Sequence, residues 1–85
     1  DLAIVLAILS SYKNKELDSK TLCFGEVGLT GEVRAVNMAE QRVIEASKMG
    51  YEVCILPQVN KEVIKNSKIK LIGIRNIREI LSLLK

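Results

Sequence analysis

The sequence contains no histidine, no tryptophan and a single proline. Without histidine, an enzyme lacks the side chain that most often serves as a general base near neutral pH. Because C-x-x-C pairs are missing as well, the sequence offers no common zinc-binding pattern. The three aromatic residues, Tyr12, Phe24 and Tyr51, are too few for a platform on which successive bases of a single strand would stack.

The size and composition of the chain indicate one small globular domain. It has 85 residues, of which 48% are hydrophobic and 27% are charged. The net charge of +3 hides an asymmetry, because residues 59–85 carry seven basic and two acidic side chains. This basic excess is compatible with a polyanionic partner, although lysine-rich surfaces also serve simply to keep small domains soluble.

The run of residues 2–9 is apolar at every position. It is too short to span a membrane, which takes about 20 apolar residues, and it lacks the basic segment and cleavage site of a signal peptide. A helix that is apolar on all sides is typical of a domain core, so we predict a buried helix over residues 2–12. Because the sequence starts within this helix, we expect a piece of a longer protein, truncated at its N-terminal side.

Cys23 and Cys54 each lie within an apolar run that has the character of a strand. Free cysteine packs as a small hydrophobic side chain, so we predict buried thiols in a reducing cytosol. A disulfide and a metal site are the less favoured alternatives.

The stretch CFGEVGLTGEVRAV, residues 23–36, places three glycines three positions apart. Strand-like segments over residues 21–27 and 32–36 flank residues 28–31, which predicts a hairpin whose turn needs the positive φ that glycine supplies. A phosphate-binding loop would instead lead from a strand into a helix and would carry a lysine. The sequence favours the hairpin.

A helix is predicted over residues 38–49, with Asn37 as N-cap, Glu40 three residues after the cap, and Gly50 as the stop. Its periodicity gives a narrow stripe of small side chains that should pack closely. The residues of this stripe are Ala39, Val43, Ala46 and Gly50.

The second half of the sequence alternates strands and helices. We predict a strand over residues 51–56 that ends at Pro57, a short helix that Asn60 caps and that runs through Asn66, a strand over residues 68–74, and a helix over residues 77–84 capped by Asn76. Such alternation favours parallel crossovers, and the hairpin is expected to make the sheet mixed. The predicted fold class is therefore α/β (α+β) with helices packed on a mixed sheet.

Few side chains form catalytic combinations. Ser10 and Ser11 near Lys13 are better explained as the polar end of a helix than as a serine–lysine dyad. Two pairs of carboxylates are also better explained without catalysis, because one pair is solvated charge in a polar loop and the other flanks the hairpin. These pairs are Glu16 with Asp18 and Glu26 with Glu32.

Three segments together carry a family resemblance: FGEVGLTGEVR at residues 24–34, EQRVIEASKMG at residues 40–50, and ILP at residues 55–57. They resemble the C-terminal Lon-protease-like domain of bacterial RadA (Sms) DNA repair proteins, and the resemblance covers essentially residues 1–85 as a single domain. It implies a fold of the Lon catalytic-domain type, similar to ribosomal protein S5 domain 2, with its N-terminal strands missing.

The resemblance also implies a function. In this family, ATP hydrolysis on a hexameric ring drives branch migration of DNA recombination intermediates, and the Lon-like ring serves as a cytoplasmic scaffold that contacts DNA. The expected partners are therefore DNA, further copies of the chain and a recombinase, with no membrane. The ATP, magnesium and zinc sites of the family lie in upstream domains, so no cofactor is expected here.

Comparison with active Lon proteases argues against peptidase activity. Their serine would fall just upstream of Asp1, and their lysine, at the start of the helix after the hairpin, matches Glu40 in this sequence. A carboxylate cannot serve as the amine base of a serine–lysine dyad. A non-catalytic scaffold is thus favoured over a Lon-type serine–lysine peptidase and over an S5-like RNA-binding module.

A scaffold that contacts DNA needs basic side chains facing phosphates. The candidates are Arg34 on the second strand of the hairpin, and Arg42 and Lys48 on the polar side of the following helix. The alternative is ordinary surface ion pairing of Arg42 with Glu45, and of Arg34 with Glu32 or Glu26.

Overall fold

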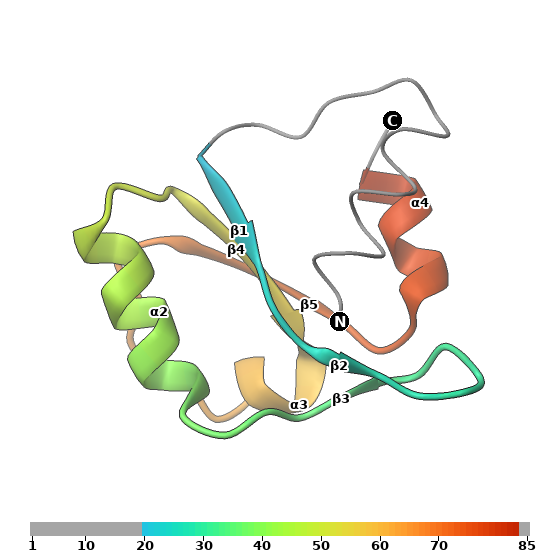
Figure 1. The fold of residues 1–85 in the computed structure, drawn as a ribbon. Coiled ribbons are helices and arrows are strands. Elements are labelled where there is room, and N and C mark those ends of the chain that lie inside the picture. Colours follow the sequence, from blue (N-terminus) through green and yellow to red (C-terminus); the bar gives the residue numbers. More distant parts are fainter. Residues whose placement is uncertain (1–19, 84–85) are drawn as a thin grey trace.

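The computed structural model describes residues 20–83, which form two small β-sheets and several short helices (Figure 1). The helix predicted over residues 2–12 lies outside the described residues. In chain order, the elements are β1 (Thr21–Cys23), β2 (Glu26–Val27), β3 (Val33–Arg34), α2 (Ala39–Lys48), β4 (Val53–Pro57), α3 (Gln58–Lys61), β5 (Lys70–Ile74), the 3-10 helix η1 (Ile77–Glu79) and α4 (Ile80–Leu83).

A parallel sheet with strand order β1-β4-β5 forms the centre of the fold. In its register, Cys54 of β4 pairs with Leu22 of β1 on one side and with Leu71 of β5 on the other. Residues 54–57 are all buried, as expected for a continuous apolar strand that is covered on both faces. The predicted parallel crossovers are confirmed.

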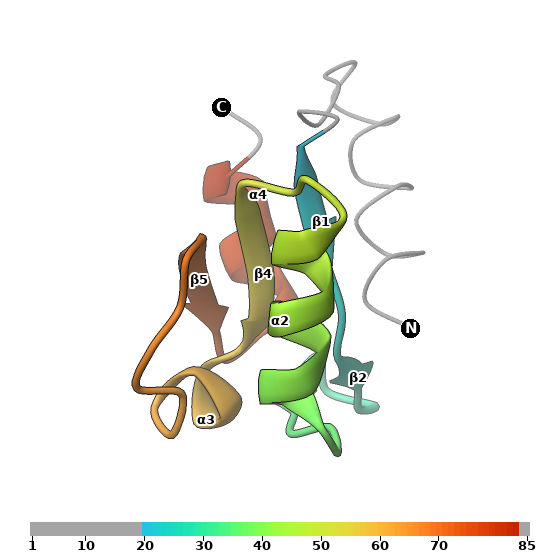
Figure 2. The same cartoon turned by 90° about the vertical axis from the view of Figure 1, so that its left-hand side faces the viewer.

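Successive side chains of β4 point to opposite faces of the sheet and enter two separate cores. Cys54 and Leu56 pack in one core with Val43 of α2, whereas Ile55 packs in the other core with Ile80 of α4. Figure 2 shows α2 in front of the sheet and α4 behind it. The sheet is thus covered by helices on both faces.

The hairpin is confirmed. β2 and β3 pair antiparallel, with Glu26 opposite Arg34, and the Gly31 N–H donates to the Gly28 C=O at 3.1 Å to close the turn. Gly31 has a φ of 87°, a left-handed conformation that a β-carbon would disfavour.

Two details of the predicted sheet are wrong. The strand predicted over residues 21–27 is broken, because Phe24 buries its ring in the core beside α2 and the chain leaves the parallel sheet there. The Phe24 N–H makes its last bond to this sheet, to the Ile55 C=O at 3.1 Å. Within residues 20–83, the hairpin therefore forms its own two-stranded sheet rather than a part of a mixed one.

The hairpin is fixed to the segment that joins β5 to η1. The Val33 N–H donates to the Arg75 C=O at 2.8 Å, and the Ile77 N–H donates to the Gly31 C=O at 2.9 Å. Asn76 caps the helix as predicted, because its side chain accepts from the Arg78 N–H at 3.0 Å. The first helical turn is a 3-10 turn, and α4 follows it.

Helix α2 begins one residue later than predicted, and Asn37 is not its cap. Met38 occupies the N-cap position in a left-handed conformation, with φ 61° and ψ 33°, and no side chain caps the helix. An N-cap side chain needs an extended backbone at its own position, and here the left-handed residue follows Asn37. Gly50 ends the helix as predicted, with φ 94°. Three residues of the predicted stripe are buried and Gly50 is exposed; the buried ones are Ala39, Val43 and Ala46.

Helix α3 also departs from the prediction. It runs over Gln58–Lys61, directly after Pro57, so Asn60 lies inside the helix rather than at its start. The Asn60 side chain is buried and hydrogen-bonded to both backbone groups of Val36, so it is not available as a cap. The helix predicted from Asn60 through Asn66 is therefore wrong.

Candidate functional site

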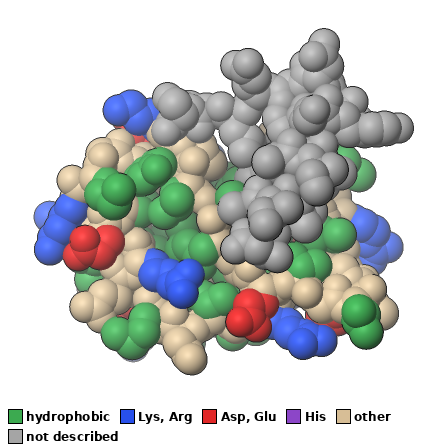
Figure 3. Space-filling view, viewed as in Figure 1, with side chains coloured by type: hydrophobic (Ala, Val, Ile, Leu, Met, Phe, Trp, Pro, Cys, Tyr) green, Lys and Arg blue, Asp and Glu red, His purple; other side chains and the backbone are tan. Residues whose placement is uncertain are grey.

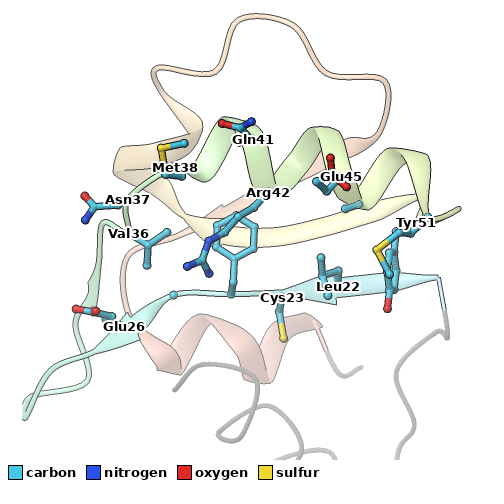
Figure 4. Close-up of a pocket in the computed structure, with 14 residues that line it drawn as sticks. Leu22, Cys23, Glu26, Val36, Asn37, Met38, Gln41, Arg42, Glu45 and Tyr51 are labelled. Carbon is cyan, nitrogen blue, oxygen red and sulfur yellow. The ribbon is translucent and has the colours of Figure 1, made fainter.

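A groove of about 810 Å³ lies between α2 and the edge formed by β1 and β2; it is called the α2–β1 groove (Figure 4). Figure 3 shows hydrophobic side chains gathered on this face, with charged side chains around them. Among the residues that line the groove are the apolar Leu22, Cys23, Phe24 and Val36, and the polar or charged Glu26, Asn37, Gln41, Arg42 and Glu45.

Arg42 is positioned in this groove by an aromatic ring. Its guanidinium carbon lies 5.4 Å from the centroid of the Phe24 ring, within the range of a cation–π contact. Phe24 is buried in the core against α2, so the ring is a fixed support, while Arg42 itself is exposed. Among the described residues, Arg42 makes this contact in place of an ion pair with Glu45.

Arg34 lies on the exposed side of β3. Its guanidinium is 3.8 Å from the Glu32 carboxylate, and the two side chains are 62% and 39% exposed. An exposed pair at this distance typically contributes under about 1 kcal/mol. The predicted alternative of a hairpin ion pair is therefore seen for Arg34, yet most of its side chain is still exposed to solvent.

The Glu32 carboxylate is mainly engaged with Thr30. It accepts hydrogen bonds from the Thr30 hydroxyl at 2.9 Å and from the Thr30 N–H at 3.3 Å. The bond from the hydroxyl is the main cause that lowers the pKa of Glu32, and the charge of Arg34 adds to it. Glu32 and Glu26 thus flank the hairpin, and Glu26 lies opposite Arg34 in the register.

Lys48 lies on the other flank of α2. It lines a separate hollow of about 380 Å³ together with Ile44, Asn66 and Lys68. The structure therefore places Arg42 and Lys48 in two different hollows along α2, and Arg34 on the hairpin. Periodicity alone did not separate them, because it assigned both helix residues to one polar side.

Glu40 is exposed in the first turn of α2. A carboxylate there is stabilised by the positive end of the helix dipole. The remaining sequence-derived catalytic candidates, Ser10, Ser11, Lys13, Glu16 and Asp18, lie outside the described residues.

Both cysteines are free thiols. Cys54 is buried, as predicted, and burial raises its pKa to about 12, with the neighbouring Cys23 adding to the effect. Cys23 is half-buried in the adjacent strand, and burial raises its pKa as well. Thiols held protonated in this way are poor nucleophiles and poor metal ligands.

Two kinds of feature are missing from the described residues. Between residues 20 and 83, no three histidine, cysteine or acidic side chains are grouped so that they could hold a metal ion. In the same part of the chain, no helix has the length and hydropathy that crossing a membrane requires.

Comparison with known proteins finds one matching family model and several similar proteins. The model of the family described as "Subunit ChlI of Mg-chelatase" matches residues 1–60. DNA repair protein RadA of Streptococcus pneumoniae is 44% identical over 82 residues, which cover 95% of this chain and 20% of that protein. RadA of Bacillus subtilis is 45% identical over 95% of this chain and 18% of its own length. RadA of Escherichia coli is 35% identical over 96% of this chain and 18% of its own length. The chain thus spans about a fifth of the length of these relatives.

Proposed function

Because this chain belongs to the family matched by the model "Subunit ChlI of Mg-chelatase" and to the RadA DNA repair proteins that resemble it over 95% of its length, we propose that it is a non-catalytic scaffold. In this proposal it assembles with copies of itself, as a hexamer in the longer protein, and contacts DNA during branch migration. ATP, magnesium and zinc are bound by other parts of that protein, and a recombinase is a further partner.

The observation that carries the non-catalytic part is the place of Glu40. A serine–lysine peptidase of the proposed Lon-like fold would need an amine at this position, in the first turn of α2, to activate its serine. The side chain present is an exposed carboxylate that suits the helix dipole. We therefore propose that this chain has no serine–lysine peptidase activity.

Arg42 supports the proposal of DNA contact most directly. A guanidinium that is fixed on an aromatic ring and still exposed loses little side-chain freedom when it binds a phosphate. Glu26 and Glu45 also line the α2–β1 groove and reduce its positive potential. We therefore assign one phosphate contact to this groove, and further contacts to Arg34 and Lys48.

The test is binding of duplex DNA measured by fluorescence anisotropy over a salt series. Each lost phosphate contact lowers the slope of log K against log salt by about 0.9. We expect Arg42→Ala to lower the slope by about this amount, and the triple variant of Arg34, Arg42 and Lys48 to lower it by about 2.7.

The matched control is Lys65→Ala, which removes one exposed positive charge from outside the three candidate positions. An equal change of slope for Lys65→Ala and Arg42→Ala would mean that net charge alone governs binding. In that case the assignment of Arg42 as a specific contact is rejected.

A further inference from the structure

Three large apolar side chains are exposed around one hollow of about 580 Å³ between the start of α2 and the residues that follow α3. Met38 is 65% exposed, Ile44 47% and Val63 70%. Apolar side chains that gather around a hollow at the surface typically mark a binding site. This hollow, called the α2–α3 groove, has an apolar wall and a polar rim. The apolar lining residues are Val36, Met38, Ala39, Ile44, Val63 and Ile64, and the polar or charged ones are Asn37, Glu40, Gln41 and Asn60.

Met38 adds a second observation at the same groove. Among the described residues, Met38 is the only one other than glycine that has a positive φ, at 61°. In this conformation the β-carbon is crowded by the backbone, and glycine would relieve the strain. Folding alone would be served better by glycine, so the exposed methionine side chain fits a role in binding.

The chain itself presents a side chain of matching character. Leu29, at the turn of the hairpin, is fully exposed, at 104% of its reference surface. Its support is rigid, because the turn is closed by the Gly31–Gly28 hydrogen bond and braced by the bond from the Thr30 hydroxyl to Glu32. An apolar side chain on a preorganised turn binds with little loss of conformational entropy.

Leu29 cannot fill the groove of its own chain. The turn is held to the start of η1 by the bond from the Ile77 N–H to the Gly31 C=O, at 2.9 Å. In Figure 1 the turn reaches the right-hand edge of the molecule, whereas α2 and the segment after α3 lie in the left half. Leu29 and the α2–α3 groove are thus on different sides of one molecule.

We propose that Leu29 of one copy inserts into the α2–α3 groove of a second copy. This head-to-tail contact rests on the self-assembly put forward under the proposed function, and it names the surfaces that meet. A heterologous contact of this kind leaves a free turn and a free groove at the two ends, so it can close into a ring. One leucine buries far less than the ~1,000 Å² of a stable interface, so association of this chain through it is weak and depends on concentration.

The first test is sedimentation velocity over a concentration series. We expect the chain to associate, and Leu29→Ser to weaken association about 10-fold or more, since a central apolar anchor is lost. Met49→Ser is the matched control, because Met49 is 72% exposed at the other end of α2 and should leave association unchanged. Association that Leu29→Ser leaves intact would overturn the docking proposal alone, whereas a monomer at every concentration would overturn proposed self-assembly too.

Met38→Gly separates binding from folding. It should raise the thermal midpoint of the chain, because the left-handed strain is relieved, and it should weaken association, because the groove loses an apolar wall. A variant that is more stable and associates as well as the original chain would contradict the role of Met38.

Engineered cysteines test the geometry. A chain with Leu29→Cys, mixed with a tagged chain carrying Val63→Cys, should form the mixed disulfide in several-fold excess over either homodimer. The native Cys23 and Cys54 are partly or fully buried, and the chain without new cysteines is the control. Homodimers through Leu29→Cys in equal or greater yield would overturn the head-to-tail arrangement.

Discussion

The side chain of Asn60 is hydrogen-bonded to both backbone groups of Val36. The Val36 N–H donates to Asn60 Oδ1 at 2.9 Å, and Asn60 Nδ2 donates to the Val36 C=O at 3.1 Å. The two residues are 24 positions apart, and Asn60 is a buried polar side chain. This pair joins the segment between the hairpin and α2 to helix α3, and so holds the walls of the α2–α3 groove together.

Asn60→Leu should therefore destabilise the chain. The substitution leaves the Val36 N–H and C=O without partners, which costs about 1–3 kcal/mol for each buried group that stays unsatisfied. Urea unfolding monitored by circular dichroism measures the loss. Asn66→Leu is the control, because Asn66 is exposed, and an equal loss for both variants would contradict this account.

Gly31 and Gly50 should respond differently to alanine. Both have positive φ, 87° and 94°, so both substitutions carry a backbone cost of about 1–2 kcal/mol. A β-carbon at Gly31 would also lie 3.2 Å from Asn76 Oδ1 and 3.2 Å from Ile77 Cγ1, whereas nothing lies within 4 Å at Gly50. Thermal unfolding should thus show the larger loss for Gly31→Ala, and the reverse order would mean that the hairpin is not fixed to η1 as described.

Glu32 should contribute to the acid sensitivity of the chain. Its pKa is lowered in the folded state, mainly by the hydrogen bond from the Thr30 hydroxyl. A carboxyl group of this kind stabilises the folded chain above its ordinary pKa, and the contribution is lost as the pH falls through the lower, folded pKa. Glu32→Gln should therefore flatten the fall in stability at acid pH, as measured by urea midpoints at several pH values. Glu26→Gln, which also removes one carboxylate from the hairpin, is the control. It should reduce the loss of stability at acid pH less than Glu32→Gln does.

Local signals predicted much of the fold. Turn glycines predicted the hairpin, Asn76 as a cap predicted the start of the last helix, and the alternating elements predicted the parallel sheet. The errors lie where a distant contact decides the local structure. Asn60 has the side chain of a helix cap, yet its amide bonds Val36 instead, and Phe24 continues a strand pattern, yet its ring turns into the core beside α2.

In the candidate site, too, local patterns predict which side chains are exposed but not which distant residues they contact. Helical periodicity places Arg42 on the exposed side of α2, and the structure agrees. Its contact with the Phe24 ring joins residues on two elements, so no local pattern could reveal it. In the sequence, Lys68 is only one charge of the basic segment 59–85, because its place in the same hollow as Lys48 depends on how the segment after α3 packs along α2.

The two thiols should react slowly in the folded chain. Burial raises the pKa of Cys54 to about 12 and also raises that of Cys23, so little of the reactive thiolate is present near pH 8. Iodoacetamide followed by mass spectrometry should modify Cys23 before Cys54, because Cys54 is fully buried, and urea should accelerate both. Since a raised thiol pKa favours the folded state below the ordinary pKa, stability should fall as the pH rises above that value. Rapid modification of Cys54 without urea would contradict its burial.

The carboxylate of Glu40 leads to two predictions, one for the stability of α2 and one for peptidase activity; Glu40→Lys tests the first. A positive charge in the first turn of α2 loses the favourable interaction of the carboxylate and adds an unfavourable one, so we expect a loss of about 0.5–2 kcal/mol in urea unfolding. Glu45→Lys makes the same charge change in the interior of α2 and should cost less. In a fluorogenic peptide assay on the longer RadA-type protein, we expect no hydrolysis by the unaltered sequence, because Glu40 cannot act as the amine base of a dyad. Hydrolysis by that unaltered protein, abolished by substitution of a serine upstream of Asp1, would replace the scaffold proposal with that of a peptidase.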